Sequence, residues 1–513
     1  MAVSTETPGS PLDRAFRAGA IVLGVLAALS VEIDEARAAG YEVGENTTLS
    51  LARGGTGVVS KRDPSALYFN PALLHRADGL QLLTDVNAID FNLAYQRDDL
   101  VYRKNRKTHR RSFDGVENSA SIFPIPAAAV SYDFGVDNLG VALGVFGPHS
   151  YGERCFGEWN NGNCSPVDDG AARHMLVHSD LIEVYASAGA GYRFELRDGE
   201  LSIGGTAILA HQNANFTLIV NSSFSPKSPW EEKPENESTF SAENLTDWRY
   251  LGIFGVAYSS GGFQIGASYR PPVRWESTGT ASVDFPESLD DIGAGLTDDE
   301  LIFRAGQAGS LRLGWRWKEG QHPGFPRRPR YDIEFNGVWE DWSNVETFEM
   351  DPKGGLNATE LPDAAQSSLP DLQPISQTKN WDDTFSLRVG GSWGALSWLT
   401  LHGGGFLESG AQPTAYTSVD FPSWGRYAGS LGASFHPFDW LDLKLAFMHV
   451  ASSERDVSSG HVYQQIPTSA CRGPEYDSDS CESPGEPPGN PQNEGTWSAN
   501  YNIGSIGATF HFY

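Results

Sequence analysis

The sequence lacks the features of several classes of protein. Its mean hydropathy is −0.35. The single long apolar run, residues 18–31, is shorter than the ~20 residues that a membrane-spanning helix needs. Only 37 Lys and Arg stand against 65 Asp and Glu, for a net charge of −28, which excludes nucleic acid as a partner because phosphates require a basic face. No two histidines have the spacing of metal ligands, so we expect neither a metal nor a cofactor.

The apolar run at 18–31 has the flanks of an export signal. Arg14 and Arg17 precede it, and Ala36-Arg37-Ala38 follows it. A basic start, a short apolar stretch and an A-x-A site are typical of a secretory signal peptide. We predict that residues 1–38 are removed on export; the alternative is a membrane anchor.

The chain has only four cysteines, and they form two local pairs. Cys155 lies near Cys164, and Cys471 lies near Cys481. Neither pair has the C-x-x-C spacing of a zinc or redox site, and an exported chain meets an oxidising compartment. We expect a disulfide in each pair, with free thiols as the alternative.

Alternation of apolar and polar residues dominates the rest of the chain. Two segments illustrate it, with the apolar residues Tyr331, Ile333, Phe335 and Trp339 in one and Leu441, Leu443, Leu445 and Phe447 in the other. Successive side chains of a strand point to opposite faces, so each such segment predicts a strand with one apolar face. A soluble β-sandwich and a membrane β-barrel both produce this pattern.

The lengths of the links separate these two folds. Seven long links alternate with six mostly short ones such as 134–137 and 197–199, as in barrels with long external loops and tight periplasmic turns. The expected strands are 80–96, 119–133, 138–148, 181–196, 200–219, 247–258, 262–281, 301–318, 329–348, 383–394, 397–411, 423–436, 439–454 and 497–513. The sequence therefore predicts an all-β fold, a closed antiparallel 14-stranded transmembrane β-barrel over 80–513, in a Gram-negative type of outer membrane. Its aromatic last strand predicts barrel-assembly machinery as a partner during biogenesis.

Residues 39–79 are rich in Gly and small polar residues and do not alternate. They precede the first strand, and a wide barrel has a lumen to fill. We predict a hatch that plugs the lumen, with a loose tail as the alternative. Buried backbone in a hatch needs hydrogen-bond partners, for which Arg312, Arg316 and Arg388 are candidates.

The segment AGYEVGENTTLSLARGGTG, followed by DPSALYFNPALL, resembles the hatch of the FadL/TodX family of outer-membrane transporters. The matching hatch residues are Arg53, Asp63, Asn70, Pro71 and Ala72. The resemblance implies a 14-stranded barrel with a hatch, and passive uptake of hydrophobic compounds such as long-chain fatty acids or hydrocarbons. The chain departs from the family in its long loops, its cysteine pairs and its basic first loop.

The third expected strand contains Gly147 and Pro148. Proline has no N–H for the ladder and glycine tolerates unusual dihedral angles, so the strand can bend inward there. The resemblance implies a lateral opening at this strand. The alternative is that Pro148 simply ends the strand.

Two long loops carry large apolar side chains whose exposure to water is unfavourable. We expect them either to form an external capture site for a hydrophobic compound or to pack the loops together. These residues are Phe224, Trp230, Phe240, Phe285, Leu289, Ile292 and Leu296.

Other motifs carry weaker hypotheses. The G-x-S-x-G motif at 390–394 lies in a strand rather than in a strand-to-helix turn, so we expect no enzyme. The first long loop contains six basic residues: Arg103, Lys104, Arg106, Lys107, Arg110 and Arg111. We expect them to contact lipopolysaccharide phosphates or to capture a substrate carboxylate; the alternative is that they are simply exposed to solvent. The expected function is therefore passive transport of hydrophobic small molecules or fatty acids, in contact with outer-membrane lipid. The alternative is a surface scaffold or secretion-system partner.

Overall fold

The computed structural model describes residues 46–104, 106–120, 122–147, 152–222, 232–326, 328–362, 372, 374–464 and 490–512. Among these residues, no helix is long and apolar enough to cross a membrane.

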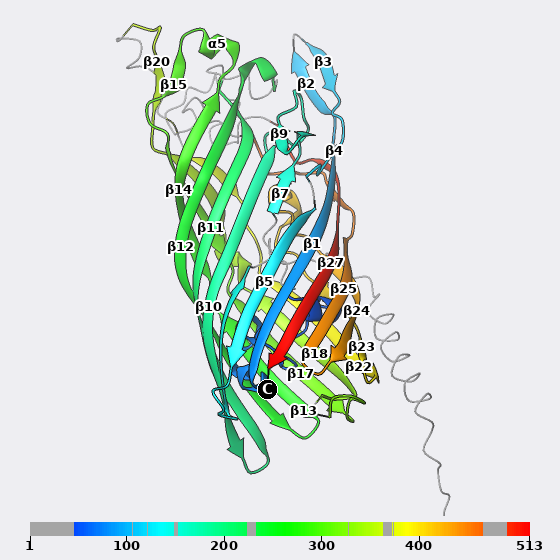
Figure 1. The fold of residues 1–513 in the computed structure, drawn as a ribbon. Coiled ribbons are helices and arrows are strands. Elements are labelled where there is room, and N and C mark those ends of the chain that lie inside the picture. Colours follow the sequence, from blue (N-terminus) through cyan, green and yellow to red (C-terminus); the bar gives the residue numbers. More distant parts are fainter. Residues whose placement is uncertain are drawn as a thin grey trace, which may run out of the picture. The chain divides into compact units, whose positions relative to one another are not determined.

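A single antiparallel sheet closes on itself to form a barrel (Figure 1). β1 (Leu80–Arg97) pairs with β5 (Phe123–Tyr132) on one side and with β27 (Gly495–Phe512) on the other, and the second pairing joins the two ends of the sheet. The fourteen-stranded barrel predicted from the sequence is thereby confirmed. Its other strands, some in two parts, are β6 (Leu139–Phe146) with β7 (Gly152–Cys155), β10 (His178–Leu196), β11 (Gly199–Asn221), β12 (Glu237–Ser260), β13 (Phe263–Arg270) with β14 (Val273–Asp284), β16 (Glu300–Gln307) with β17 (Ser310–Glu319), β18 (Tyr331–Glu340) with β19 (Thr347–Pro352), β21 (Ile375–Thr378) with β22 (Thr384–Leu396), β23 (Leu399–Glu408), β24 (Arg426–Phe438), and β25 (Leu441–Ser452) with β26 (Arg455–Val457).

Some strand limits differ from the prediction. The strand expected at 262–281 is divided into β13 and β14 at Pro271-Pro272, because a proline cannot donate to the ladder. The strand expected at 247–258 begins at Glu237 instead, so part of the expected third long link is strand. η3 (Trp342–Asn344) lies between β18 and β19. The remaining short elements lie in the long links: β2 (Leu100–Lys104), β3 (Lys107–Arg111), β4 (Val116–Glu117), β8 (Glu158–Asn160), β9 (Asn163–Ser165), η2 (Pro234–Asn236), α5 (Glu287–Asp290), β15 (Ala294–Leu296), β20 (Leu356–Ala358) and η4 (Thr414–Tyr416).

The two faces of the barrel wall follow the alternation in the sequence. In β25, Leu443, Leu445 and Phe447 are exposed on the outer surface, whereas Asp442 and Lys444 are buried in the lumen. Exposed aromatic side chains gather near the short turns: Tyr132, Tyr192, Trp317, Tyr331, Trp393, Trp398 and Trp440. An apolar outer belt with an aromatic girdle at its edge is the surface of a barrel embedded in lipid.

The segment before β1 lies inside the barrel, near the end with the short turns (Figure 1). Residues 46–79 contain α2 (Thr48–Ala52), α3 (Ala66–Phe69) and η1 (Pro71–Arg76). Helix α2 contacts β1, β23, β24, β25 and β27, whereas η1 contacts β6 and β10 to β12. Below, residues 46–79 are called the lumen segment; the predicted signal peptide 1–38 and residues 39–45 lie outside the described residues.

Candidate functional site

Asn70, Pro71 and Ala72 fix the turn between α3 and η1 in the lumen segment. The Asn70 side chain accepts a hydrogen bond from Ala72 N at 3.1 Å and so caps η1. Its amide nitrogen donates to Val58 O at 2.9 Å and to Val256 O of β12 at 3.2 Å. Pro71 occupies the first position of η1, where a missing N–H costs nothing. One asparagine therefore holds the lumen segment both to itself and to the wall, which gives the Asn-Pro-Ala motif a structural role.

A row of four glycines forms the surface on which η1 lies. Gly140, Gly191, Gly204 and Gly255 are direct cross-strand neighbours on β6, β10, β11 and β12. A Cβ atom at any of them would overlap Asn70, Pro71 or Leu74 of the lumen segment. The wall thus carries no side chains where η1 packs against this row, a use of glycine that sequence spacing alone did not reveal.

Buried charges anchor the other half of the lumen segment. Arg53 donates to Asp332 Oδ1 at 2.7 Å and to Glu334 Oε2 at 3.3 Å, both on β18. Asp332 also pairs with Arg316 of β17. Asp63, the other charged residue of the resemblance, accepts from Ser65 N at 2.9 Å and stabilises the turn before α3.

The three arginines predicted to satisfy the lumen segment behave differently from one another. Arg312 donates to Tyr68 O at 3.1 Å, as expected. Arg316 instead reaches Asp332 and Gln264 of the wall. Arg388 pairs with Glu408 at 3.0 Å. These two arginines pair with the wall, because the acids on the neighbouring strands are better partners for a cation than a backbone carbonyl is.

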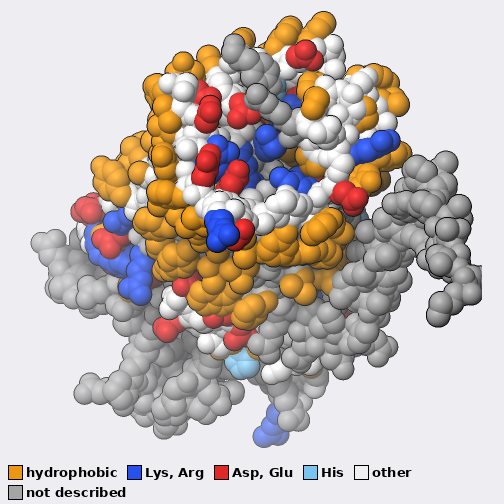
Figure 2. Space-filling model, turned by 90° about the horizontal axis from the view of Figure 1, so that it is seen from below, with side chains coloured by type: hydrophobic (Ala, Val, Ile, Leu, Met, Phe, Trp, Pro, Cys, Tyr) orange, Lys and Arg blue, Asp and Glu red, His pale blue; other side chains and the backbone are white. Residues whose placement is uncertain are grey.

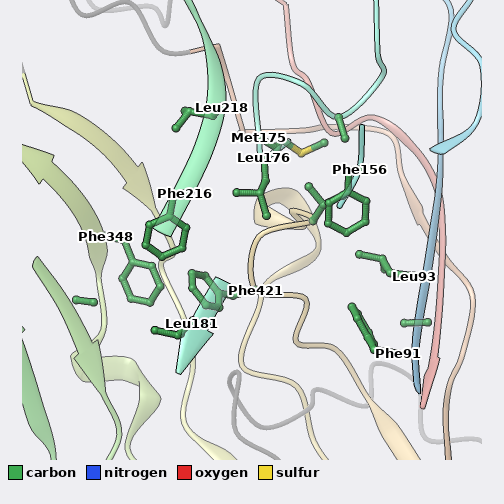
Figure 3. Close-up of a cluster of buried hydrophobic side chains, with 14 of the residues drawn as sticks. Phe91, Leu93, Phe156, Met175, Leu176, Leu181, Phe216, Leu218, Phe348 and Phe421 are labelled. Atoms are coloured by element: carbon green, nitrogen blue, oxygen red, sulfur yellow. The ribbon is translucent and has the colours of Figure 1, made fainter. Parts of the chain in front are cut away.

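The outer half of the lumen is filled by an apolar cluster, called the outer cluster below (Figure 3). Strands β1, β10, β11 and β19 and the long loops contribute Phe91, Leu93, Phe156, Met175, Leu176, Leu181, Phe216, Leu218, Phe348 and Phe421. Within it, the ring centroids of Phe348 and Phe421 lie 4.9 Å apart. A buried ion pair joins Lys379 to Asp420, and the Lys379 ammonium lies 5.0 Å from the Phe348 ring centroid. The inner end of the same barrel is lined by charges, so the lumen changes from apolar to polar along its axis.

Among the described residues, the ladder between β5 and β6 ends near Gly147. β5 pairs with β6 only up to Ala128 and Val145, although β5 continues along β1 to Phe123. Beyond Phe146, β10 next pairs with β7, at Leu181 and Gly152. The interruption is bounded on its outer side by a hydrogen bond of 2.9 Å from Ser119 N to Cys155 O. Pro148 lies outside the described residues, so its own conformation stays a prediction.

Two prolines lie on the interrupted stretch of β5, and sequence reasoning missed their role. Pro124 and Pro126 pair with Ala88 and Val86 of β1. A proline fits such a ladder only where its nitrogen faces away from the partner strand. The two nitrogens therefore face the side on which no described residue of β6 pairs with β5, and they leave no N–H there without a partner.

The expected capture residues are brought together in part. Phe240, Phe285 and Leu289 line a narrow apolar cavity of about 30 Å³ with Val220, Val283, Leu356 and Ile375. Leu296 pairs with Leu356 in the small sheet of β15 and β20, and Ile292 follows the four-residue helix α5. Phe224 and Trp230 lie outside the described residues. The capture site therefore stays a prediction.

The remaining predicted groups fall at separate places. Cys155 and Cys164 form the predicted disulfide, whereas Cys471 and Cys481 lie outside the described residues. The basic first loop forms the hairpin β2–β3, with Arg106, Lys107 and Arg110 exposed. Ser392 of the G-x-S-x-G motif lies in β22 and bonds to His402 Nδ1 at 2.8 Å and to Arg53; it is not on a strand-to-helix turn.

Solved structures with the same fold are outer-membrane channels. A FadL homologue of Pseudomonas aeruginosa superposes with a TM-score of 0.68 at 15% identity, covering 93% of this chain and 100% of that one. The toluene transporter TodX of P. putida gives 0.59 at 14% identity, with 92% and 100% covered. The toluene transporter TbuX of Ralstonia pickettii gives 0.57 at 13% identity, with 91% and 98% covered. These likenesses show the fold, a closed antiparallel barrel of fourteen strands.

The family model described as outer membrane protein transport protein (OMPP1/FadL/TodX) matches residues 29–480. The chain belongs to this family, as the resemblance of its hatch residues implied. No curated protein matches it. It is therefore an outer-membrane transport channel and not an enzyme.

Proposed function

We propose that this protein carries hydrophobic compounds, such as long-chain fatty acids or hydrocarbons, into the outer membrane without an energy source. In this proposal a compound is captured by the apolar loop residues and enters the outer cluster. It then meets the lumen segment, which acts as a hatch, and leaves sideways through the interruption between β5 and β6. An apolar solute avoids the polar surface layer in this way.

The observation that carries the proposal is the position of the interruption. Phe123, on the unpaired stretch of β5, packs against the outer cluster. Phe146, at the end of β6, belongs to the second cluster, which contains the lumen segment, and its ring centroid lies 6.3 Å from that of Tyr68. Among the described residues, the ladder between β5 and β6 therefore ends at the level where the apolar outer lumen meets the lumen segment.

The chemistry of the lumen favours a sideways exit over a straight one. Below the hatch, the lumen is lined by Arg53, Arg316, Asp332 and Asp442 among others. Moving an apolar molecule into such a charged region gains nothing from the hydrophobic effect, whereas lipid offers an apolar environment at once. Backbone groups that face lipid must be satisfied, and Pro124 and Pro126 reduce that cost at the interruption.

Uptake by cells tests the proposal. Labelled palmitate and labelled toluene are supplied to cells that contain or lack the protein, and to cells with Phe421→Ser in the outer cluster. We expect uptake of at least one compound to require the protein and to fall in Phe421→Ser. Phe134→Ser, an exposed aromatic position in a short turn, is the matched control and should retain uptake. No protein-dependent uptake of either compound, together with a co-purifying protein partner, would favour the scaffold alternative.

A further inference from the structure

A polar cavity opens at the end of the barrel that carries the short turns. Its volume is about 570 Å³, and it lies between the underside of the lumen segment, the wall and the turn around Arg328. Figure 2 views this end and shows Lys, Arg, Asp and Glu side chains gathered in a hollow that hydrophobic side chains surround. The basic residues that line the cavity are Arg53, Arg62, Arg76, Arg316, Arg328 and Lys444.

Four of the arginines in this cavity have carboxylate partners. Arg53 and Arg316 share Asp332. Arg328 pairs with Asp442 at 2.8 Å, and Arg62 lies 4.0 Å from Asp78.

Arg76 is the exception. Its Nη1 donates to Val59 O at 2.9 Å, and its Nη2 donates to Ser259 Oγ at 2.6 Å. Both acceptors are neutral, and no ion pair joins Arg76 to a carboxylate among the described residues.

The surroundings of Arg76 are unfavourable to a cation. Burial, together with the like charges of Arg316 and Arg62, lowers the pKa of Arg76 to about 9, although Glu200 and Glu334 act in the opposite direction. A half-buried guanidinium without a direct ion pair raises the free energy of the folded state, and a bound anion would offset that cost.

The balance of charges indicates which anion fits. Among the described residues that line the cavity, six are basic and five are acids, Asp63, Asp78, Asp332, Asp439 and Asp442. With the four lining histidines counted as neutral, these residues leave one positive charge in excess, which a monoanion balances and a dianion exceeds. The planar fork of a guanidinium suits a planar group with two oxygens.

We propose that the cavity binds a carboxylate that enters from the periplasm, with Arg76 as its principal ligand. The hatch separates this site from the outer cluster, so the proposal does not depend on the transport path proposed above. It gives the periplasmic mouth a binding function of its own.

Binding of ¹³C-labelled butyrate to the mature protein in a neutral detergent tests the proposal, measured by titration calorimetry and carbon NMR. The wild type should bind butyrate more tightly than it binds inorganic phosphate at a pH where phosphate is mainly dianionic. Arg76→Gln should weaken butyrate binding about ten- to hundredfold, as expected for a lost charge-assisted pair. Arg76→Lys, which keeps the charge but loses the fork, should lie between the two.

Arg304→Gln is the matched control. Arg304 is partly exposed in β16 and pairs with Glu349 at 2.6 Å, so its loss should leave butyrate binding unchanged. Heat-dependent migration on gels verifies that each variant is a folded barrel. Absence of butyrate binding to the wild type, equal binding by Arg76→Gln, an equal loss in Arg304→Gln, or tighter binding of phosphate would overturn the proposal.

Discussion

Gly204 of β11 lies so close to Pro71 of the lumen segment that a side chain on residue 204 would overlap the Pro71 carbonyl carbon. The two residues lie far apart in the sequence, and the fold brings them into contact. The glycine row therefore forms a surface against which η1 packs closely. We expect a larger side chain in this row to reduce the stability of the fold.

We predict that Gly204→Ala displaces η1 and destabilises the protein. Overpacking of this kind costs about 1–3 kcal/mol. Thermal unfolding followed by circular dichroism measures the loss, and protease accessibility of residues 46–79 reports on the displacement. Gly337→Ala is the matched control, because a Cβ atom on this strand glycine meets nothing within 4 Å. If the two variants unfolded at the same temperature, the close approach of Gly204 to Pro71 would contribute nothing to stability.

Arg53 provides a second prediction about the lumen segment. Arg53→Gln leaves Glu334 and, in part, Asp332 buried with less positive charge around them. Removing one partner of a buried ion pair lowers the free energy of unfolding by about 3–5 kcal/mol. Because Arg316 still pairs with Asp332, we expect a loss near the lower end of this range. We expect residues 46–79 to become sensitive to protease while the barrel itself stays folded. A lumen segment that stays resistant would mean that Arg53 does not anchor it.

The turn that contains His322 predicts a dependence of stability on pH. Burial, with the nearby charges of His436 and Arg328, lowers the pKa of His322 from 6.5 to about 4. As pH falls below about 6.5 the unfolded chain takes up this proton before the folded chain does, so stability decreases between pH 6.5 and 4. His322→Asn should reduce that decrease in thermal unfolding measured across this window. An identical pH profile in the variant would contradict the assignment.

The second cysteine pair gives a chemical prediction. Cys155 and Cys164 form a disulfide, and the same local spacing leads us to expect a bond between Cys471 and Cys481. Each closes a loop of about ten residues, for which the chain-entropy model gives about 2–3 kcal/mol. Peptide mapping without reductant should find both bonds within their own loops. Free thiols or crossed pairs would refute the second bond.

Much of the fold could be predicted because alternation is a local property. Alternation with Tyr331, Ile333 and Phe335 places the acids of β18, Asp332 and Glu334, on the polar face of that strand. Their partner Arg53 lies 279 residues away from Asp332, and only the closed barrel brings them together. The glycine row depends in the same way on strand register, which the sequence does not specify without the neighbouring strands. The paired prolines of β5 acquire a meaning only once β6 is known to end early. Cys155 and Cys164 could be paired beforehand because they are close in sequence.

The central claim is that a hydrophobic compound leaves through the interruption between β5 and β6. A disulfide tether tests it, with Ala127→Cys and Phe146→Cys placed one rung beyond the last pair, Ala128 and Val145. The matched control is a disulfide between Ser187→Cys and Ile208→Cys. These two positions face each other in the continuous ladder of β10 and β11.

Uptake of the labelled compound is the measurement, compared before and after reduction in the two tethered variants. The account predicts that oxidation lowers uptake in the Ala127→Cys, Phe146→Cys variant, that reductant restores it, and that the control tether has no effect. Undiminished uptake with the interruption locked shut would contradict the account.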